Sequence, residues 1–172
     1  MFIDWISMSA VYLLTCSDDQ PVQIDTDLNA KPLTWWKSVN AEAWRCYFEG
    51  VKPVFSECTE LKLLSHLNGA SHQELGGFHY VVETDVSEAN DEEFNAWYDT
   101  EHLPGLAKVP GAISAKRLIR LSGGPRYIAC YDLVSPAVME SEAWLSIRHT
   151  AWSSRIRPMF FNTTRTLFVR HA

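Results

Sequence analysis

The residues best suited to chemistry lie close together near the middle of the chain, at the predicted end of a helix. Trp97 and Tyr98 are followed by Glu101 and His102, and Pro104 comes two residues later. Aromatic side chains can wall an apolar pocket, and an imidazole can give or take a proton near neutral pH. A neighbouring carboxylate can orient the ring. This spacing predicts a candidate acid–base site at the end of one helix.

Positions three and four apart share one face of a helix, so Phe94, Trp97, Tyr98, Glu101 and His102 are predicted to form one stripe. In this site His102 is the general acid or base, Glu101 orients it, and Tyr98 and Trp97 form the pocket wall. The helix dipole and the nearby carboxylate both favour a protonated ring. A histidine that only caps the helix end is the alternative role.

Two strands supply further candidate binding residues. His79 and Tyr80 alternate along a strand, so one faces the helices and the other faces the opposite side of the sheet. Arg117 falls on an apolar strand face, where a charge needs a partner. Asp132, Glu83 or a substrate carboxylate could be that partner, and an ion pair within the fold is the favoured interpretation.

The elements that must position these residues follow a recognisable order from about residue 76 onward. Asn90 is a good helix N-cap, acidic residues fill the next turn, and Pro104 stops the helix soon after His102. The β-branched and aromatic segments on either side favour strands. The predicted elements are a strand at 78–83, a helix at 90–102, strands at 112–121 and 127–134, a helix at 140–157 and a strand at 164–171. This β-α-β-β-α-β order is the ferredoxin-like arrangement of an α+β fold.

The earlier part of the chain contains a weak internal repeat. The segment 52–55 resembles 157–160, and 61–66 resembles 166–171 at the same spacing. Helical character around 35–51 then predicts a β-α-β half module over 11–66, with a surface loop at 19–32 and one more possible strand at 1–7. We therefore expect two parts, a partial ferredoxin-like half module over 1–75 and a complete module over 76–172.

The strand order, together with the pattern W-Y-x-x-E-H-x-P followed by V-P-G, resembles the dimeric α+β barrel superfamily and, within it, the EthD-like proteins. The residues that carry the resemblance are Trp97, Tyr98, Glu101, His102, Pro104, Val109, Pro110 and Gly111. The resemblance implies two ferredoxin-like sheets packed face to face as a barrel, by homodimerisation or by tandem duplication. It also implies roles such as monooxygenase, cyclase, isomerase or haem-handling enzyme.

Composition excludes other classes of function. The chain has 15 basic and 21 acidic residues and a formal net charge of −6, so a nucleic-acid partner is not expected. Its four cysteines form no CxxC pair, which favours reduced thiols and a cytoplasmic location. No apolar run is long enough for a membrane helix. No metal-ligand spacing and no phosphate-binding or serine-nucleophile motif is present.

The sequence thus predicts a cofactor-independent enzyme that performs acid–base chemistry on a small aromatic or polyketide-like molecule. The catalytic residues would be His102, Glu101 and Tyr98, and the substrate-binding residues Trp97, His79, Tyr80 and Arg117. Two alternatives stay open: a non-catalytic ligand-binding or dimerisation module, and a haem-binding protein. The expected partners are a small molecule and a second copy of the chain, with no metal and no membrane.

Overall fold

Eight β-strands close into a barrel in the computed structural model, which describes residues 10–17, 34–49 and 58–171. The barrel order is β1-β3-β2-β8-β5-β7-β6-β4, and β1 pairs with both β3 and β4, which closes the ring. All of these pairings are antiparallel. The strands are β1 (Val11–Cys16), β2 (Trp35–Ser38), β3 (Trp44–Glu49), β4 (Thr59–Asn68), β5 (Phe78–Asp85), β6 (Ala112–Arg120), β7 (Tyr127–Leu133) and β8 (Phe161–His171).

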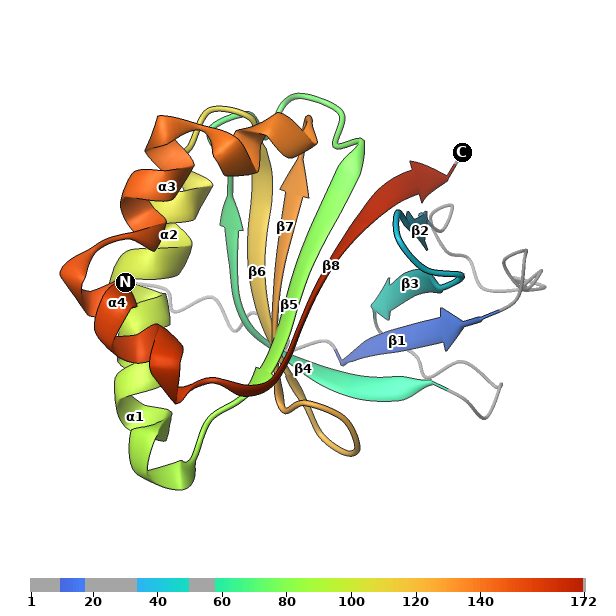
Figure 1. Cartoon of the computed structure of the whole chain (residues 1–172). Helices are drawn as coiled ribbons and strands as arrows, with labels where there is room; N and C mark the ends of the chain where they lie inside the picture. The colour runs from blue at the N-terminus through green and yellow to red at the C-terminus, as the bar shows by residue number, and fades with distance from the viewer. Residues whose placement is uncertain (1–9, 18–33, 50–57, 172) are drawn as a thin grey trace, which may run out of the picture.

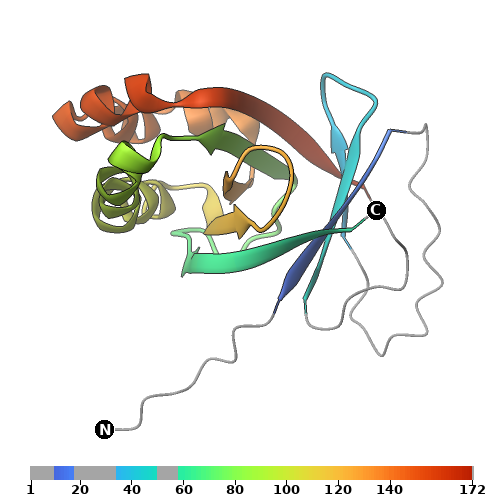
Figure 2. The same cartoon turned by 90° about the horizontal axis from the view of Figure 1, so that it is seen from below.

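The second part of the chain has the predicted β-α-β-β-α-β order, so the ferredoxin-like α+β fold is confirmed. Helices follow β5 and β7 and pack on the outer face of these strands (Figure 1), with the same arrangement from below (Figure 2). The first group is α1 (Glu88–Trp97), the π-helical turn η1 (Tyr98–His102) and α2 (Leu103–Ala107). The second group is η2 (Pro136–Glu140), α3 (Glu142–Arg148), α4 (Ala151–Ile156) and η3 (Arg157–Met159).

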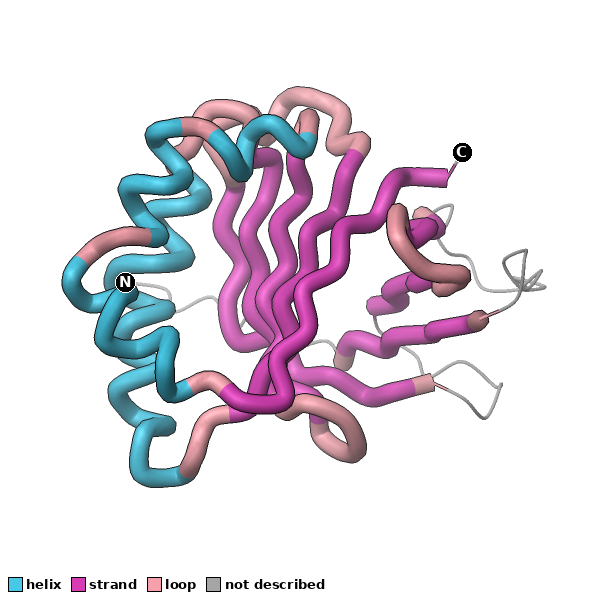
Figure 3. The backbone as a smooth tube through the Cα atoms, in the orientation of Figure 1, coloured by secondary structure: helices cyan, strands magenta, loops and turns pink. Residues whose placement is uncertain are grey.

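The prediction of a helix around residues 35–51 is wrong, because strands β2 and β3 lie in this region (Figure 3). Trp44, Cys46 and Phe48 are buried, and the residues between them are less so, which is the two-residue period of a strand. In the described residues of 11–66, strands β1 to β4 therefore replace the expected β-α-β order. The loop expected at 19–32, the strand expected at 1–7 and the repeat segment 52–55 lie outside the described residues.

Helix boundaries differ from the prediction in two places. The first helix begins at Glu88, with Ser87 rather than Asn90 in the N-cap position, and helical structure continues past His102 to Ala107. The second predicted helix is divided into α3 and α4. Ser141 and Thr150 each accept a backbone N–H at the start of one of these helices, so the chain restarts its helix at Thr150.

Two apolar cores lie on opposite faces of the C-terminal strands. Alternation along β5 directs Tyr80 and Val82 toward the helices, and His79 and Val81 into the barrel. The helix-side core contains Phe94, Trp97 and Trp144, and the barrel core contains Leu13, Leu118 and Phe168. No helix in the described part of the chain is long and apolar enough to cross a bilayer.

Candidate functional site

One π-helical turn, Tyr98–His102, joins α1 to α2 and carries the predicted catalytic residues. The backbone N–H of Leu103 donates to the carbonyl of Tyr98, five residues back, instead of four. Pro104 follows at the start of α2 and has no N–H for an α-helical bond. A π turn holds one residue more than an α turn, and such turns occur frequently at functional sites.

His102 lies under this turn with only 8% of its surface exposed. Its ring stacks on Trp97, with ring centres 4.1 Å apart and planes 23° apart, and meets the ring of Tyr98 edge-on at 5.3 Å. Its Nδ1 atom is buried and has no hydrogen-bond partner within the described residues. An unpaired buried polar atom costs free energy, so this nitrogen calls for an explanation.

A pocket opens beside the imidazole, between the helices and the outer face of β5 and β7. Its free space is about 40 Å³, and the space between its lining residues is about 420 Å³ when the open mouth is included. The aromatic part of its wall consists of Tyr80, Trp97, Tyr98, Tyr131, Trp144 and Phe160. The enclosed space holds only a few water molecules, so a larger ligand must displace side chains at the mouth.

Tyr131 supplies a second unpaired polar atom to this pocket. It is 1% exposed, and its hydroxyl has no hydrogen-bond partner among the residues that the structure describes. Burial, followed by the neighbouring Tyr98 hydroxyl, raises the pKa of Tyr131 well above its ordinary value. The hydroxyl therefore keeps its proton and can donate it to a ligand oxygen.

The charge state of His102 is opposite to the sequence expectation. Burial, and then the positive charges of Arg148, Arg157 and Arg117, lower the pKa of His102 to about 3. The helix dipole does not compensate, because the helix does not end at His102. The imidazole is therefore neutral at physiological pH, and it can accept a hydrogen bond rather than donate from a charged ring.

Glu101, the predicted orienting residue, contacts the second helical group instead. Its carboxylate accepts a 2.6 Å hydrogen bond from the hydroxyl of Thr150, which is the N-cap of α4. No hydrogen bond joins Glu101 to His102 within the described part of the chain. The carboxylate thus ties the π turn to the start of α4.

Arg117 also lies beside the pocket rather than in its wall. It is 2% exposed, and its guanidinium donates to Asp99 at 2.9 Å and to Asn95 at 2.7 Å. It also lies 4.4 Å from the centre of the Tyr98 ring. The predicted pairing of Arg117 with Asp132 or Glu83 is wrong, because these two acids face the barrel interior while Arg117 faces the helices.

His79 lies on the opposite face of the sheet from the pocket. Its Nδ1 bonds to Asp132 at 2.7 Å, its Nε2 bonds to the hydroxyl of Tyr47 at 3.1 Å, and its ring stacks on Trp36. The structure therefore brings together Tyr80, Tyr98 and His102 with Trp97, and it leaves His79 in the barrel.

Several pocket residues were not predicted. Tyr131 lies on the helix-facing side of β7, which the alternation of that strand could have shown. Arg148, Arg157 and Arg165 come from α3, η3 and β8, and they surround the mouth of the pocket. No motif links these three arginines in the sequence, because three separate elements bring them together.

The pocket meets only one requirement for haem. The free nitrogen of His102 is a suitable axial ligand, but a space of about 40 Å³ does not admit a macrocycle of four pyrrole rings. No group of three or more histidine, cysteine or acidic side chains that could hold a metal ion occurs in the described residues. The enclosed space would therefore have to widen before haem could enter.

No family model matches the sequence, and no curated protein matches it. Solved structures do match. An uncharacterised ferredoxin-fold protein related to antibiotic biosynthesis monooxygenases, from Listeria monocytogenes, is 15% identical, with a TM-score of 0.67 and coverage of 96% of this chain and 95% of that one. A haem-degrading enzyme from L. monocytogenes is 10% identical, with a TM-score of 0.66 and coverage of 93% and 98%. An anthrone oxidase-like protein is 15% identical, with a TM-score of 0.63 and coverage of 97% and 93%.

These similarities define the class of the fold. The chain has the ferredoxin-like architecture that these solved structures share. At this level of identity the likeness extends to the fold alone.

Proposed function

We propose that this chain is a cofactor-independent enzyme that abstracts a proton from a small aromatic or polyketide-like substrate in the helix-side pocket. The observation that carries the proposal is the unpaired Nδ1 of His102, buried in a pocket walled by aromatic rings. Most buried side-chain nitrogens in proteins have a hydrogen-bond partner, so a purely structural histidine would usually have satisfied this atom. Perturbed titratable groups in a cleft are typical of functional sites.

In this mechanism the neutral ring of His102 carries its proton on Nε2 and presents the lone pair of Nδ1. That lone pair takes a proton from an acidic C–H or O–H bond of the substrate, and the electron pair of that bond moves onto the substrate oxygen. The O–H of Tyr131 donates a hydrogen bond to the resulting enolate or phenolate oxygen. The rings of Trp97 and Tyr98 hold the aromatic substrate beside the imidazole.

Anthrone is a suitable probe, because its C10–H is acidic and exchange with deuterium reports proton abstraction alone. We expect the chain to accelerate this exchange anaerobically, and His102→Gln to reduce the acceleration by about 100-fold, the usual contribution of one general base. His149→Gln serves as the control, since His149 is exposed at the end of α3. Exchange at the buffer rate, together with no shift of the His102 ring signals on adding anthrone, would contradict the proposal.

The non-catalytic ligand-binding module is the second candidate, and the small enclosed volume of the pocket favours it. In that case anthrone shifts the NMR signals of His102 and exchanges no faster than in buffer. Haem binding requires the pocket to widen, and a Soret band that depends on His102 after addition of hemin would reveal it.

We further propose the finer features that the sequence resemblance implies, namely EthD-like ancestry, a homodimer and a cytoplasmic location. The first and second parts of the chain, 1–75 and 76–172, would then descend from two related modules. One chain already supplies every strand of the closed barrel, so a homodimer would form through an outer face. Light scattering of the purified chain measures this directly, and a monomer at micromolar concentration would exclude the dimer.

A further inference from the structure

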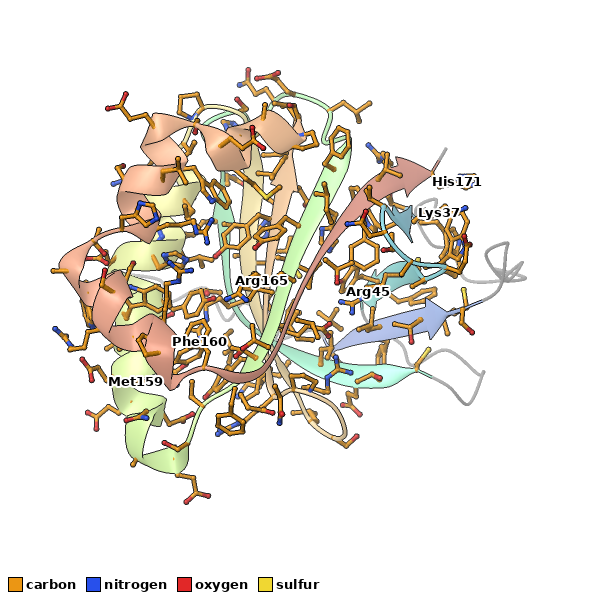
Figure 4. The ribbon with its side chains drawn as sticks, viewed as in Figure 1. Lys37, Arg45, Met159, Phe160, Arg165 and His171 are labelled. Atoms are coloured by element: carbon orange, nitrogen blue, oxygen red, sulfur yellow. The ribbon has the colours of Figure 1, made fainter. Side chains whose placement is uncertain are left out.

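Three arginines gather at the mouth of the pocket without a carboxylate partner in the described part of the chain. Arg148 ends α3, Arg157 begins η3 and Arg165 lies on β8, so three elements contribute one cation each. Figure 4 shows Arg165 lying between β8 and the helices, near Phe160. Arg155 on the neighbouring helix, by contrast, pairs with Glu93 at 2.7 Å.

These arginines are close enough to repel one another. Burial, and then the charges of Arg148 and Arg165, lower the pKa of Arg157. The same three guanidinium groups act on the hydroxyl of Tyr80, which lines the pocket below them. Bringing like charges together is unfavourable unless an anion offsets them, and guanidinium groups bind carboxylates through paired, charge-assisted hydrogen bonds.

We propose that the pocket takes an aromatic ligand with an acidic group, which Arg148, Arg157 and Arg165 hold at the mouth while the ring enters among the aromatic side chains. This inference rests on the proposed function, since it concerns the ligand of the same pocket. It assigns a place to each part of such a ligand. Arg165 is exposed, so a displacement of its side chain away from Tyr80 would admit a ring larger than the enclosed space.

The bound anion also acts on the proton-accepting residue. His102 faces Arg148 from α3, Arg157 from η3 and Arg117 from β6, and all three charges oppose its protonation. Arg117 is already paired with Asp99, whereas no carboxylate among the described residues pairs with Arg148 or Arg157. A ligand acid at the mouth would therefore offset two of the three cations and make the imidazole a stronger base when the site is occupied.

Two pairs of probes that differ only in charge test this inference: 1-naphthoate against 1-naphthamide, and benzoate against benzamide. Isothermal titration should show each acid binding at least tenfold more tightly than its amide. Arg165→Gln should weaken binding of the acids about tenfold, the ratio expected for one charge-assisted pair, and leave the amides unchanged. Arg155→Gln is the matched control, because this exposed arginine is paired with Glu93 outside the pocket. It should change neither series.

The outcomes separate this inference from the proposed function. Equal binding of acid and amide would overturn the inference that the arginines bind an acidic group, and it would leave the proposal of a pocket for aromatic molecules in place. The inference would also be overturned if the preference for acids is unchanged both in Arg165→Gln and in the double variant with Arg148→Gln and Arg157→Gln. If neither acids nor amides bind at millimolar concentration, both the inference and the proposed pocket function fail.

Discussion

Two buried histidines in this chain have opposite charge states, and the cause is the set of atoms around each ring. Burial disfavours the charged form of both. At His79 the interactions with Cys130 and Asp132 outweigh burial and raise the pKa to about 9. The hydrogen bond between His79 and Asp132 also helps to lower the pKa of Asp132 to about 2. At His102 burial is joined by the charges of nearby arginines, with no opposing acid among the described residues, and the pKa falls to about 3.

These shifts determine how stability depends on pH. The ordinary pKa of histidine is 6.5, and in the folded protein that of His102 is about 3. Between these two pH values His102 therefore binds a proton in the unfolded chain but not in the folded one. The folded state therefore loses stability as the pH falls through this range. His79 contributes stability that is complete below pH 6.5 and is lost as the pH rises toward 9.

For His102→Gln we expect the acid-side loss to shrink. Between pH 7 and pH 5 the wild-type free energy of unfolding should fall by about 2 kcal/mol more than that of the variant, as the linkage relation gives for this shift. Urea unfolding at the two pH values measures the difference. Parallel pH profiles for the two proteins would mean that His102 is protonated in the folded state.

The sequence predicted part of this site for physical reasons that are local. Helical spacing placed Trp97, Tyr98 and His102 together. Strand alternation showed that His79 and Tyr80 face opposite sides of the sheet, without showing which of them faces the helices. The predicted charge of His102 was wrong because its pKa depends first on burial and then on Arg148 and Arg157, which are some fifty residues away in the sequence. Local pattern carries no information about such neighbours.

At the scale of elements, the π turn decides where the imidazole lies. A π turn is one residue longer than an α turn, so the helix on each side keeps its phase while the inserted residue changes the direction of nearby side chains. The sequence predicted a helix that ends at His102, because Pro104 commonly stops helices. The extra residue instead allows Pro104 to stand in the first turn of α2.

Deletion of Thr100 tests this interpretation, because this exposed residue lies within the turn. We expect the deletion to restore a continuous α-helix with a loss of about 1–3 kcal/mol in stability, the usual range for one change. Binding of anthrone or 1-naphthoate should fall at least tenfold, since His102 and Tyr98 change direction. Circular dichroism checks the helix content and calorimetry checks binding. Unchanged binding would show that the turn has no part in positioning the ring.

The strands at 35–38 and 44–49 show where element prediction failed. Trp44, Cys46 and Phe48 alternate with Arg45 and Tyr47, which is the two-residue period of a strand, but the segment is too short for this period alone to exclude a helix. Pairing with β1 and β8 decides the outcome, and such long-range pairing cannot be read from one segment.

At the scale of the whole molecule, the barrel explains why one chain contains two sets of four strands. The second part has the order β8-β5-β7-β6, and the first part has the matching order β4-β1-β3-β2. Described helices cover only the second set (Figure 1). The predicted half module is therefore a complete four-strand set in this region, and the pocket forms where helices are present.

One buried acid links the two sets across the barrel interior. Glu83 on β5 accepts hydrogen bonds from Arg45 on β3 and Arg120 on β6, and all three side chains are at least 87% buried. Arg45 also lies over the ring of Phe168 on β8, 5.0 Å from its centre. The carboxylate thus joins a strand of the first set to strands of the second.

Glu83→Gln should leave two buried cations without their counter-charge. We expect the free energy of unfolding to fall by about 3–5 kcal/mol, the cost of removing one member of a buried ion pair. Urea unfolding, followed by circular dichroism, measures this loss. Glu93→Gln is the matched control, because its partner Arg155 is exposed and such pairs contribute at most about 1 kcal/mol. If the two variants lose similar stability, the interior carboxylate does not hold the two halves of the barrel together, and the apolar contacts among Leu13, Leu118 and Phe168 carry that role instead.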